Sequence, residues 1–188
     1  MRCFVAIELS DAIRRSLSAM QRRHAALDRV IRWTRPEQIH LTLKFLGEVR
    51  ETDMPAVCET MAAMAARFAP IEFAVRRAGC FPPGGSARIF WAGLDEPTGR
   101  LGRLRDALEA AYADMGFPRE NRAFKPHLTI GRVRDPRGSR EIRAAVAAEA
   151  GFEGGRQTAS EIVLFESILA PQGATYVALA RASLTGSE

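Results

Sequence analysis

The chain has 188 residues, of which 47% are hydrophobic and 26% are charged. These values are typical of a globular protein with its own core, and no apolar run approaches the ~20 residues that span a bilayer. The net charge of +5 at pH 7 comes almost entirely from arginine, whose planar fork of donors suits phosphate. The charge favours a polyanion such as RNA, although a GC-rich genome explains the arginine content equally well.

In chain order, alternating apolar patterns and turn residues predict the elements that follow. The first part of the chain has a strand over 2–9, a helix capped by Ser10 to about 27, a strand over 31–35, a turn at 36–38, a strand over 40–49 and a helix over 53–68. The middle has strands over 71–78 and 88–94 around a loop at 82–85, followed by a helix from 97 or 98 to about 115. The last part has a strand over 124–133, a helix over 141–150, and strands over 162–170 and 175–182 around a turn at 171–173.

The N-terminal segment and the cysteines indicate the compartment. Glu8 and Asp11 interrupt the first apolar run too early for a secretory signal. The three cysteines are odd in number and far apart in the sequence. That usage indicates reduced thiols rather than disulfides or a zinc site. We therefore expect a cytoplasmic protein without a membrane partner.

The tetrapeptide His-hydrophobic-Thr-hydrophobic occurs twice, beginning at His40 and at His127, and it contains two of the three histidines. In a strand, residues two apart point to the same face. Each copy therefore places an imidazole beside the hydroxyl of Thr42 or Thr129. Imidazole exchanges protons near neutral pH, and hydroxyls donate hydrogen bonds to phosphate oxygens. Two such strands together indicate paired acid–base chemistry on an oxyanion.

The duplication also predicts an architecture. The two histidines lie 87 residues apart, and each half of the chain has one motif strand and two helices. We expect an α+β fold with two pseudo-symmetric lobes, in which antiparallel sheets face a central cleft and helices lie outside. Residues 1–188 would form a single bilobal domain, with one motif in each lobe, that acts as a monomer.

Residues 31–49 resemble the first motif of the 2H phosphoesterases, and most of all the bacterial RNA 2',3'-cyclic phosphodiesterases, also called 2'-5' RNA ligases. Residues 124–133 resemble the second motif, and residues 4–7 and 89–94 are also similar to that group. The resemblance runs from residue 2 to about 182. It implies metal-independent hydrolysis of 2',3'-cyclic phosphates at RNA ends to 2'-phosphates. It further implies ATP-independent 2'-5' ligation, best known on tRNA halves.

The family pattern assigns His40 as the proton donor and His127 as the proton acceptor, an order that the sequence alone does not fix. Thr42 and Thr129 would hydrogen-bond the non-bridging phosphate oxygens as charge develops. No cofactor is implied. Two histidines with two threonines lack the third strong ligand of a catalytic zinc site, and there is no phosphate-binding loop that ends in Lys-Ser or Lys-Thr.

The resemblance also implies that Arg132 contacts the terminal nucleotide. Strict alternation places Arg132 on the face opposite His127, so this role requires a bulge or bend at Gly131. A solvent-facing arginine fits the sequence equally well. Alternation places Lys44 and Lys125 on the same strand faces as the motif histidines. Either lysine would then add positive charge at the cleft or lie at its solvent edge.

The remaining histidine and four aromatic residues carry weaker signals. His24 lies on the polar side of the first helix, and we expect it at the surface. Aromatic residues in strands usually pack in the core, which is the expectation for Phe45 and Trp91. Trp33 and Phe81 fit either the core or a base-stacking position at the cleft rim.

Two other functions use the same features. A phosphodiesterase for a small cyclic phosphate or a 2'-5' oligonucleotide would need the same four motif residues. A non-catalytic RNA-binding protein would explain the basic charge, but it leaves the duplicated histidine without a purpose.

Overall fold

Two antiparallel sheets form the framework of the chain, which this computed structural model describes over residues 1–170 and 173–188. The first sheet has the strand order β3 (His40–Glu48), β1 (Arg2–Glu8), β8 (Glu161–Ala170) and β9 (Gly173–Ser183). Its first strand carries the first His-x-Thr motif.

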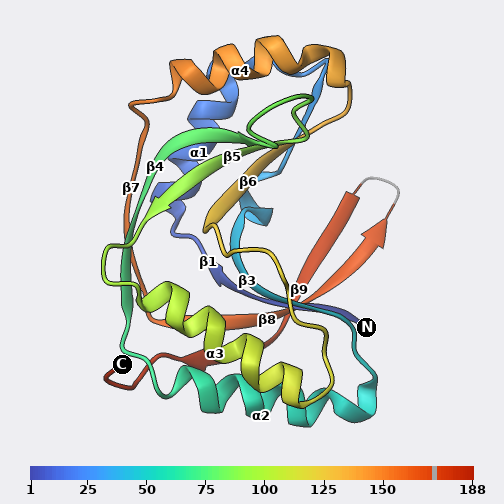
Figure 1. Ribbon diagram of the computed structural model, residues 1–188, viewed down its shortest axis with the longest axis vertical. Helices are drawn as coiled ribbons and strands as arrows, with labels where there is room; N and C mark the ends of the chain where they lie inside the picture. Colours follow the sequence, from blue (N-terminus) through green and yellow to red (C-terminus); the bar gives the residue numbers. More distant parts are fainter. Residues whose placement is uncertain (171–172) are drawn as a thin grey trace.

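The second sheet carries the other motif. Its strand order is β2 (Ile31–Trp33), β6 (His127–Val133), β5 (Ile89–Asp95), β4 (Ile71–Phe81) and β7 (Glu153–Ala159). Figure 1 shows this sheet above the first one, and the motif strands β3 and β6 contact each other between them. The two motifs therefore come from different sheets and meet in the middle of the molecule.

The helices lie on the outer sides of the sheets, and each sheet is covered by helices from both halves of the chain (Figure 1). The upper sheet packs against α1 (Asp11–Arg23) and α4 (Ser139–Ala148), while α2 (Met54–Ala65) and α3 (Arg100–Asp114) cover the lower one. The predicted α+β fold with two lobes is confirmed. The helix α1 follows β1 of the first sheet but covers the second, an exchange that the sequence pattern did not predict.

The helix α1 forms as its sequence predicts but ends earlier. The Ser10 hydroxyl accepts a hydrogen bond from the Ile13 amide at 3.4 Å, which satisfies one free donor of the first turn. Ile13, Leu17 and Met20 are fully buried. The α-helix stops at Arg23, and a short 3-10 turn over Ala25–Leu27 replaces the last predicted turn.

Strand β7 was missed by the sequence pattern. Its residues include two adjacent glycines and several polar side chains, and they form a strand because they pair with β4. The second motif strand begins at His127 rather than 124, directly after Pro126, which has no N–H for a ladder. In the predicted turn at 171–173, residues 171 and 172 lie outside the described residues, and Gly173 begins β9.

Among the described residues, no helix combines the length and apolar composition that crossing a membrane requires.

Candidate active site

Each motif strand presents its histidine and threonine on the face away from the main core. In β3, Leu41 and Leu43 are buried beneath the sheet, whereas His40 and Thr42 are half-buried on the opposite face. The strand β6 repeats this pattern residue for residue over its first four positions. The predicted sharing of a face by imidazole and hydroxyl is therefore present in both motifs.

Both motif imidazoles are held by the same local hydrogen bond. The Nδ1 of His40 donates to the Gln38 carbonyl at 2.8 Å, and the Nδ1 of His127 donates to the Lys125 carbonyl at 2.7 Å. A carbonyl oxygen only accepts, so each Nδ1 carries the hydrogen. The Nε2 of each neutral ring is then the nitrogen that is able to accept a proton.

His40 lies against a small aromatic cluster. Its ring stacks on Phe4 with centroids 4.7 Å apart, and the ring of Tyr176 meets it edge-on at 5.1 Å. Phe165 also stacks on Phe4, with centroids 5.4 Å apart, and its ring lies 6.3 Å from that of His40. Phe4 and Phe165 belong to a buried apolar cluster separate from the main core. The motif face of the first sheet is therefore largely apolar.

This environment changes the acidity of His40. Burial disfavours the charged imidazole and lowers the pKa of His40 from 6.5 to about 4. The hydrogen bond to the Gln38 carbonyl acts in the opposite direction, and the positive charge of Arg132 adds to the decrease. His40 is thus neutral at pH 7 in the free protein.

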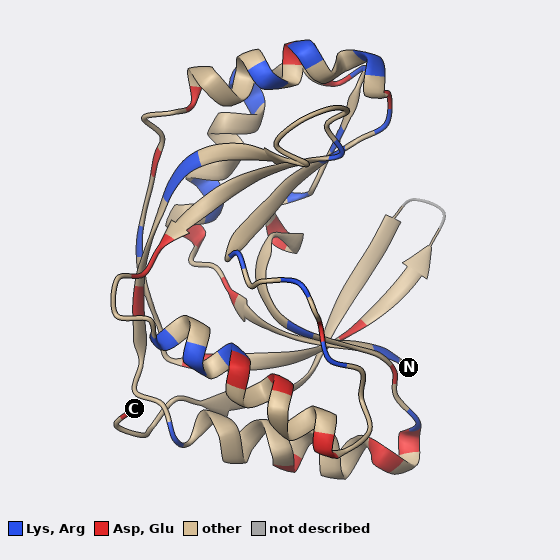
Figure 2. Ribbon diagram, viewed as in Figure 1, with Lys and Arg blue, Asp and Glu red and all other residues tan. Residues whose placement is uncertain are grey.

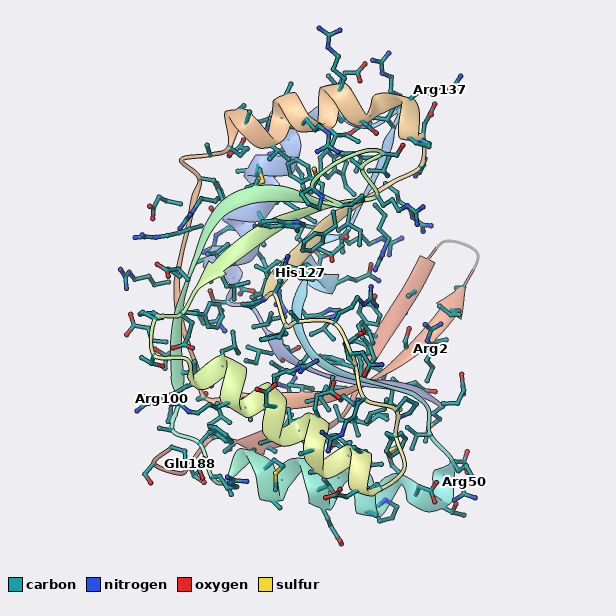
Figure 3. The ribbon with its side chains drawn as sticks, in the orientation of Figure 1. Arg2, Arg50, Arg100, His127, Arg137 and Glu188 are labelled. Atoms are coloured by element: carbon teal, nitrogen blue, oxygen red, sulfur yellow. The ribbon has the colours of Figure 1, made fainter. Side chains whose placement is uncertain are left out.

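His127 has a more open setting, at the centre of the molecule between the two sheets (Figure 3). The ring of Phe81 meets it edge-on at 5.0 Å, and Phe81 also packs on Trp91 at 5.3 Å. Trp91 pairs with Thr129 across the sheet and lies over Gly79, where an added Cβ would come within 2.0 Å of the indole. Phe81 therefore lies at the site, and Trp91 is half-buried beside it rather than in the core as predicted.

A bulge in β3 corrects two predictions. Lys44 pairs with Val5 and Thr42 pairs with the next residue of β1, so Leu43 is left over and the alternation shifts. Lys44 is therefore buried on the helix side, where its ammonium donates to Glu109 at 2.8 Å. Phe45 is turned out and is 66% exposed. Lys44 is not at the cleft, and Phe45 is not a core residue.

The same bulge occurs in β6 and decides the position of Arg132. Gly131 pairs with Phe90 and Thr129 with the next residue of β5, so Ile130 is left over. The shift places exposed Arg132 on the same face as the motif histidine, and its charge acts on His40 of the other sheet. The bend that the sequence required near Gly131 is therefore present.

A pocket of about 350 Å³ opens beside His40. Arg14 of α1 is among its lining residues and has an Nε that is buried without a hydrogen-bond partner in the described part of the chain. An Nη of the same guanidinium lies 3.5 Å from the Asp11 carboxylate. Sequence patterning did not identify Arg14, because its contribution depends on the exchange of α1 to the second sheet.

His24 has a structural role, whereas Trp33 packs at the edge of the core and also lines a pocket beside β2. The Nε2 of His24 lies 2.8 Å from the Glu149 carboxylate, which also accepts two hydrogen bonds from Arg23. The prediction that His24 lies at the surface is wrong, because its side chain is half-buried and joins the ends of α1 and α4. Trp33 packs edge-on against buried Phe90 with centroids 5.8 Å apart.

The described residues contain no group of three or more His, Cys, Asp or Glu side chains that would hold a metal ion. Of the three free cysteines, Cys3 and Cys80 are buried and Cys58 is half-buried.

Comparison with known proteins identifies the family. A sequence model described as LigT-like phosphoesterase matches residues 7–91 and again 93–176, so each match contains one His-x-Thr motif. The chain belongs to the LigT-like phosphoesterases of the 2H family. This LigT-like phosphoesterase is thus an enzyme, and the two matches fall on the two halves that the duplicated motif predicted.

Several curated relatives align with nearly the whole LigT-like chain. A Methanothermobacter thermautotrophicus protein named RNA 2',3'-cyclic phosphodiesterase is 31% identical over 176 residues, covering 94% of this chain and 95% of the relative. An Archaeoglobus fulgidus protein of the same name is 33% identical, with 94% and 96% covered.

Solved structures share the fold. A crystal structure of a Thermus thermophilus protein superposes with a TM-score of 0.85 at 28% identity and full coverage of both chains. Escherichia coli LigT complexed with 3'-AMP superposes with a TM-score of 0.79 at 28% identity, with 98% of each chain covered.

Proposed function

We propose that this LigT-like phosphoesterase hydrolyses 2',3'-cyclic phosphates at RNA 3' ends to 2'-phosphates, without a metal ion or other cofactor. The observation that carries the proposal is the matched pair of imidazoles, anchored through Nδ1 by the same hydrogen bond and each accompanied by a threonine. Hydrolysis at phosphorus needs one proton acceptor for water and one donor for the leaving oxygen. Two histidines on facing sheets provide both.

In the proposed reaction, His127 removes a proton from water as the water oxygen attacks phosphorus. The P–O3' bond breaks, and His40 gives a proton to O3', so that the phosphate stays on O2'. Each proton transfer typically contributes about 10²–10⁴ in rate. The products are a free 3'-hydroxyl and a 2'-phosphate.

Thr42 and Thr129 would donate hydrogen bonds to the non-bridging oxygens, where negative charge increases in the transition state. Arg132 would bind the terminal nucleotide through its phosphate or by stacking on the base. The bulge in β6 that turns Arg132 to the motif face supports this role.

The role of His40 as donor requires substrate. Burial keeps its ring neutral at pH 7 in the free protein, because the pKa is lowered to about 4. An anionic phosphate beside the ring favours the protonated form and raises the pKa again. We propose that the substrate itself creates the acid form of His40.

The curated relatives are named for this activity, and the LigT complex holds a nucleotide with a 3'-phosphate. Both support RNA ends as substrates. We propose tRNA halves as one source of such ends. Attack by the 5'-hydroxyl of a second RNA in place of water would form a 2'-5' linkage without ATP. We propose that residues 1–188 act as one bilobal catalytic domain, as a monomer in the cytoplasm.

A substrate comparison tests the proposal. Purified protein is given an RNA with a 2',3'-cyclic phosphate end, a 3',5'-cyclic nucleotide and a 2'-5' linked dinucleotide, and the products are separated by chromatography. The proposal predicts turnover of the cyclic RNA end only, with the phosphate on O2'. Faster turnover of either small substrate would favour the alternative phosphodiesterase, and a 3'-phosphate product would contradict the proposed bond cleavage.

A further inference from the structure

A second pocket adjoins the one beside His40. It has a volume of about 560 Å³ and is lined from β2 on one side and from the β8–β9 hairpin on the other. Figure 1 shows this hairpin projecting away from the helices. The two pockets share Arg35, Gln38 and Thr175. They therefore form one groove, here called the outer groove, that leads from His40 to the edge of the second sheet.

Arginines dominate the end of the outer groove that lies away from His40. There Arg32, Arg35 and Arg134 face one carboxylate, that of Asp28, which accepts a hydrogen bond from the Trp33 indole at 2.6 Å. The part beside His40 adds Arg14 together with the carboxylates of Glu8 and Glu37. Figure 2 shows many of the acidic residues on α2 and α3, outside the lower sheet. The end of the groove away from His40 is thus a local concentration of positive charge.

Two of these arginines lie outside the ion pairs of the described residues. Arg35 and Arg134 are exposed, and neither forms an ion pair within residues 1–170 and 173–188, whereas many other surface arginines do. Arg134 follows directly on β6, and Arg35 lies between β2 and the first motif. Their guanidinium groups are therefore not committed to a carboxylate of the described chain.

The walls of the groove approach each other at Arg32. Its Nη2 lies 2.5 Å from the position that a Cβ on Gly173 would take, so the side chain reaches from β2 to the first described residue of β9. Any larger residue at 173 would displace this guanidinium. The glycine, at a φ of 128°, thus keeps room for the cation.

We propose that the outer groove binds the phosphodiester backbone of the RNA that precedes the cyclic phosphate end. The inference rests on the proposed function, because it extends the path of the same substrate away from His40. Such RNA carries one negative charge per nucleotide, and the arginine fork binds phosphate oxygens in pairs. The hydroxyl of Thr175 and the amide of Gln38 line the junction of the two pockets, where polar groups suit a ribose.

The test compares substrate length and salt dependence in the full chain. Initial rates are measured on 2',3'-cyclic AMP and on an RNA of about ten nucleotides that ends in the same group, from about 50 to 200 mM salt. For wild type, kcat/KM should be higher on the RNA and should fall more steeply with salt. The Arg134→Gln variant should lower the ratio of the two kcat/KM values by several fold.

The dependence of kcat/KM on salt measures how many RNA phosphates the arginines contact. Each phosphate contact on a single strand contributes about 0.7 to the slope of log affinity against log salt. On the RNA, Arg134→Gln should reduce the slope by about 0.7 and Arg35→Gln/Arg134→Gln by about 1.4. Arg134→Lys retains the charge and should recover most of the slope.

A matched control is Arg140→Gln, which removes one exposed charge on α4 outside both pockets. It should leave the ratio and the slope as in wild type, and thermal unfolding by circular dichroism confirms that each variant is folded. Equal ratios and slopes in the Arg134→Gln and Arg140→Gln variants would overturn the proposal.

Failure of the proposed function gives a different pattern. If wild type hydrolyses neither substrate, fluorescence anisotropy is measured with a labelled RNA of about ten nucleotides that ends in a 2'-phosphate, over the same salt range. Weaker binding by Arg134→Gln than by Arg140→Gln still supports the groove. Equal binding by both variants rejects it.

Discussion

Phe45 and Arg132 occupy the same position in the two motif strands: each lies five residues after its histidine, and the same bulge turns each onto the histidine face. Without the bulge, strict alternation would send both side chains to the opposite face. The two lobes thus present one exposed ring and one cation at equivalent places. This difference breaks the symmetry of an otherwise duplicated site.

The position of Phe45 predicts how its loss affects stability. Because the ring is 66% exposed, Phe45→Ala should lower the free energy of unfolding by less than about 1 kcal/mol. The matched variant is Phe90→Ala, which removes a fully buried ring from the main core and should cost about 3–5 kcal/mol. Urea unfolding followed by circular dichroism measures both. Equal losses would mean that Phe45 is buried after all.

The threonines should contribute less than the histidines. A hydrogen bond to a charged oxygen is worth about 1.5–3 kcal/mol, so Thr42→Val and Thr129→Val should each lower kcat/KM by roughly 10- to 150-fold. Valine keeps the branched shape of threonine and removes only the hydroxyl. Thr→Ser at either position restores the hydroxyl and should recover most of the rate. A valine variant with wild-type kcat/KM would exclude the hydroxyl from the reaction.

The donor and acceptor roles can be separated with a sulfur leaving group. A cyclic substrate with sulfur in place of O3' releases a thiolate, which needs no proton from the enzyme. If His40 is the donor, the rate loss of His40→Ala should shrink by about 10²-fold or more on this substrate, while that of His127→Ala stays the same. The opposite pattern would make His127 the donor and His40 the acceptor. The comparison matters because His40 is neutral in the free protein and could also accept a proton.

The half-buried His40 also makes stability depend on pH. The pKa of His40 is about 4 in the folded protein and about 6.5 when unfolded, so the unfolded state binds more protons between these values. Stability should therefore fall as pH decreases through this window. Between pH 7.5 and 5, wild type should lose about 2 kcal/mol more than His40→Gln, measured by urea unfolding at each pH. An identical loss in both proteins would show that His40 titrates normally.

The sequence predicted the repeated features of this fold and missed those that depend on long-range pairing. The faces of His40 and Thr42 follow from strand periodicity alone, which is local. The bulge at Leu43 depends on the register with β1, so alternation placed Lys44 and Phe45 on the wrong faces. The equal offset of Phe45 and Arg132 from the two histidines was a usable signal, because two copies of one motif should bend alike.

Other differences have the same origin. His24 looks like a surface residue on its own helix, but its partner Glu149 lies 125 residues away at the end of α4. Arg14 reaches the pocket of His40 because α1 crosses to the second sheet. Neither contact is encoded in local spacing. The four motif residues could be predicted because strand periodicity places each reactive histidine and its threonine on one face. The residues around them could not be predicted, because tertiary contacts bring them to the site.

The most direct test of the two-histidine reaction is product analysis with excess EDTA on an RNA that ends in a 2',3'-cyclic phosphate, using wild type, His40→Ala, His127→Ala and the control His24→Ala. A two-histidine, metal-free reaction predicts conversion to a 2'-phosphate by wild type and by His24→Ala, and a loss of about 10²-fold or more in each motif variant. Loss of wild-type activity in EDTA, or full activity in either motif variant, would contradict it.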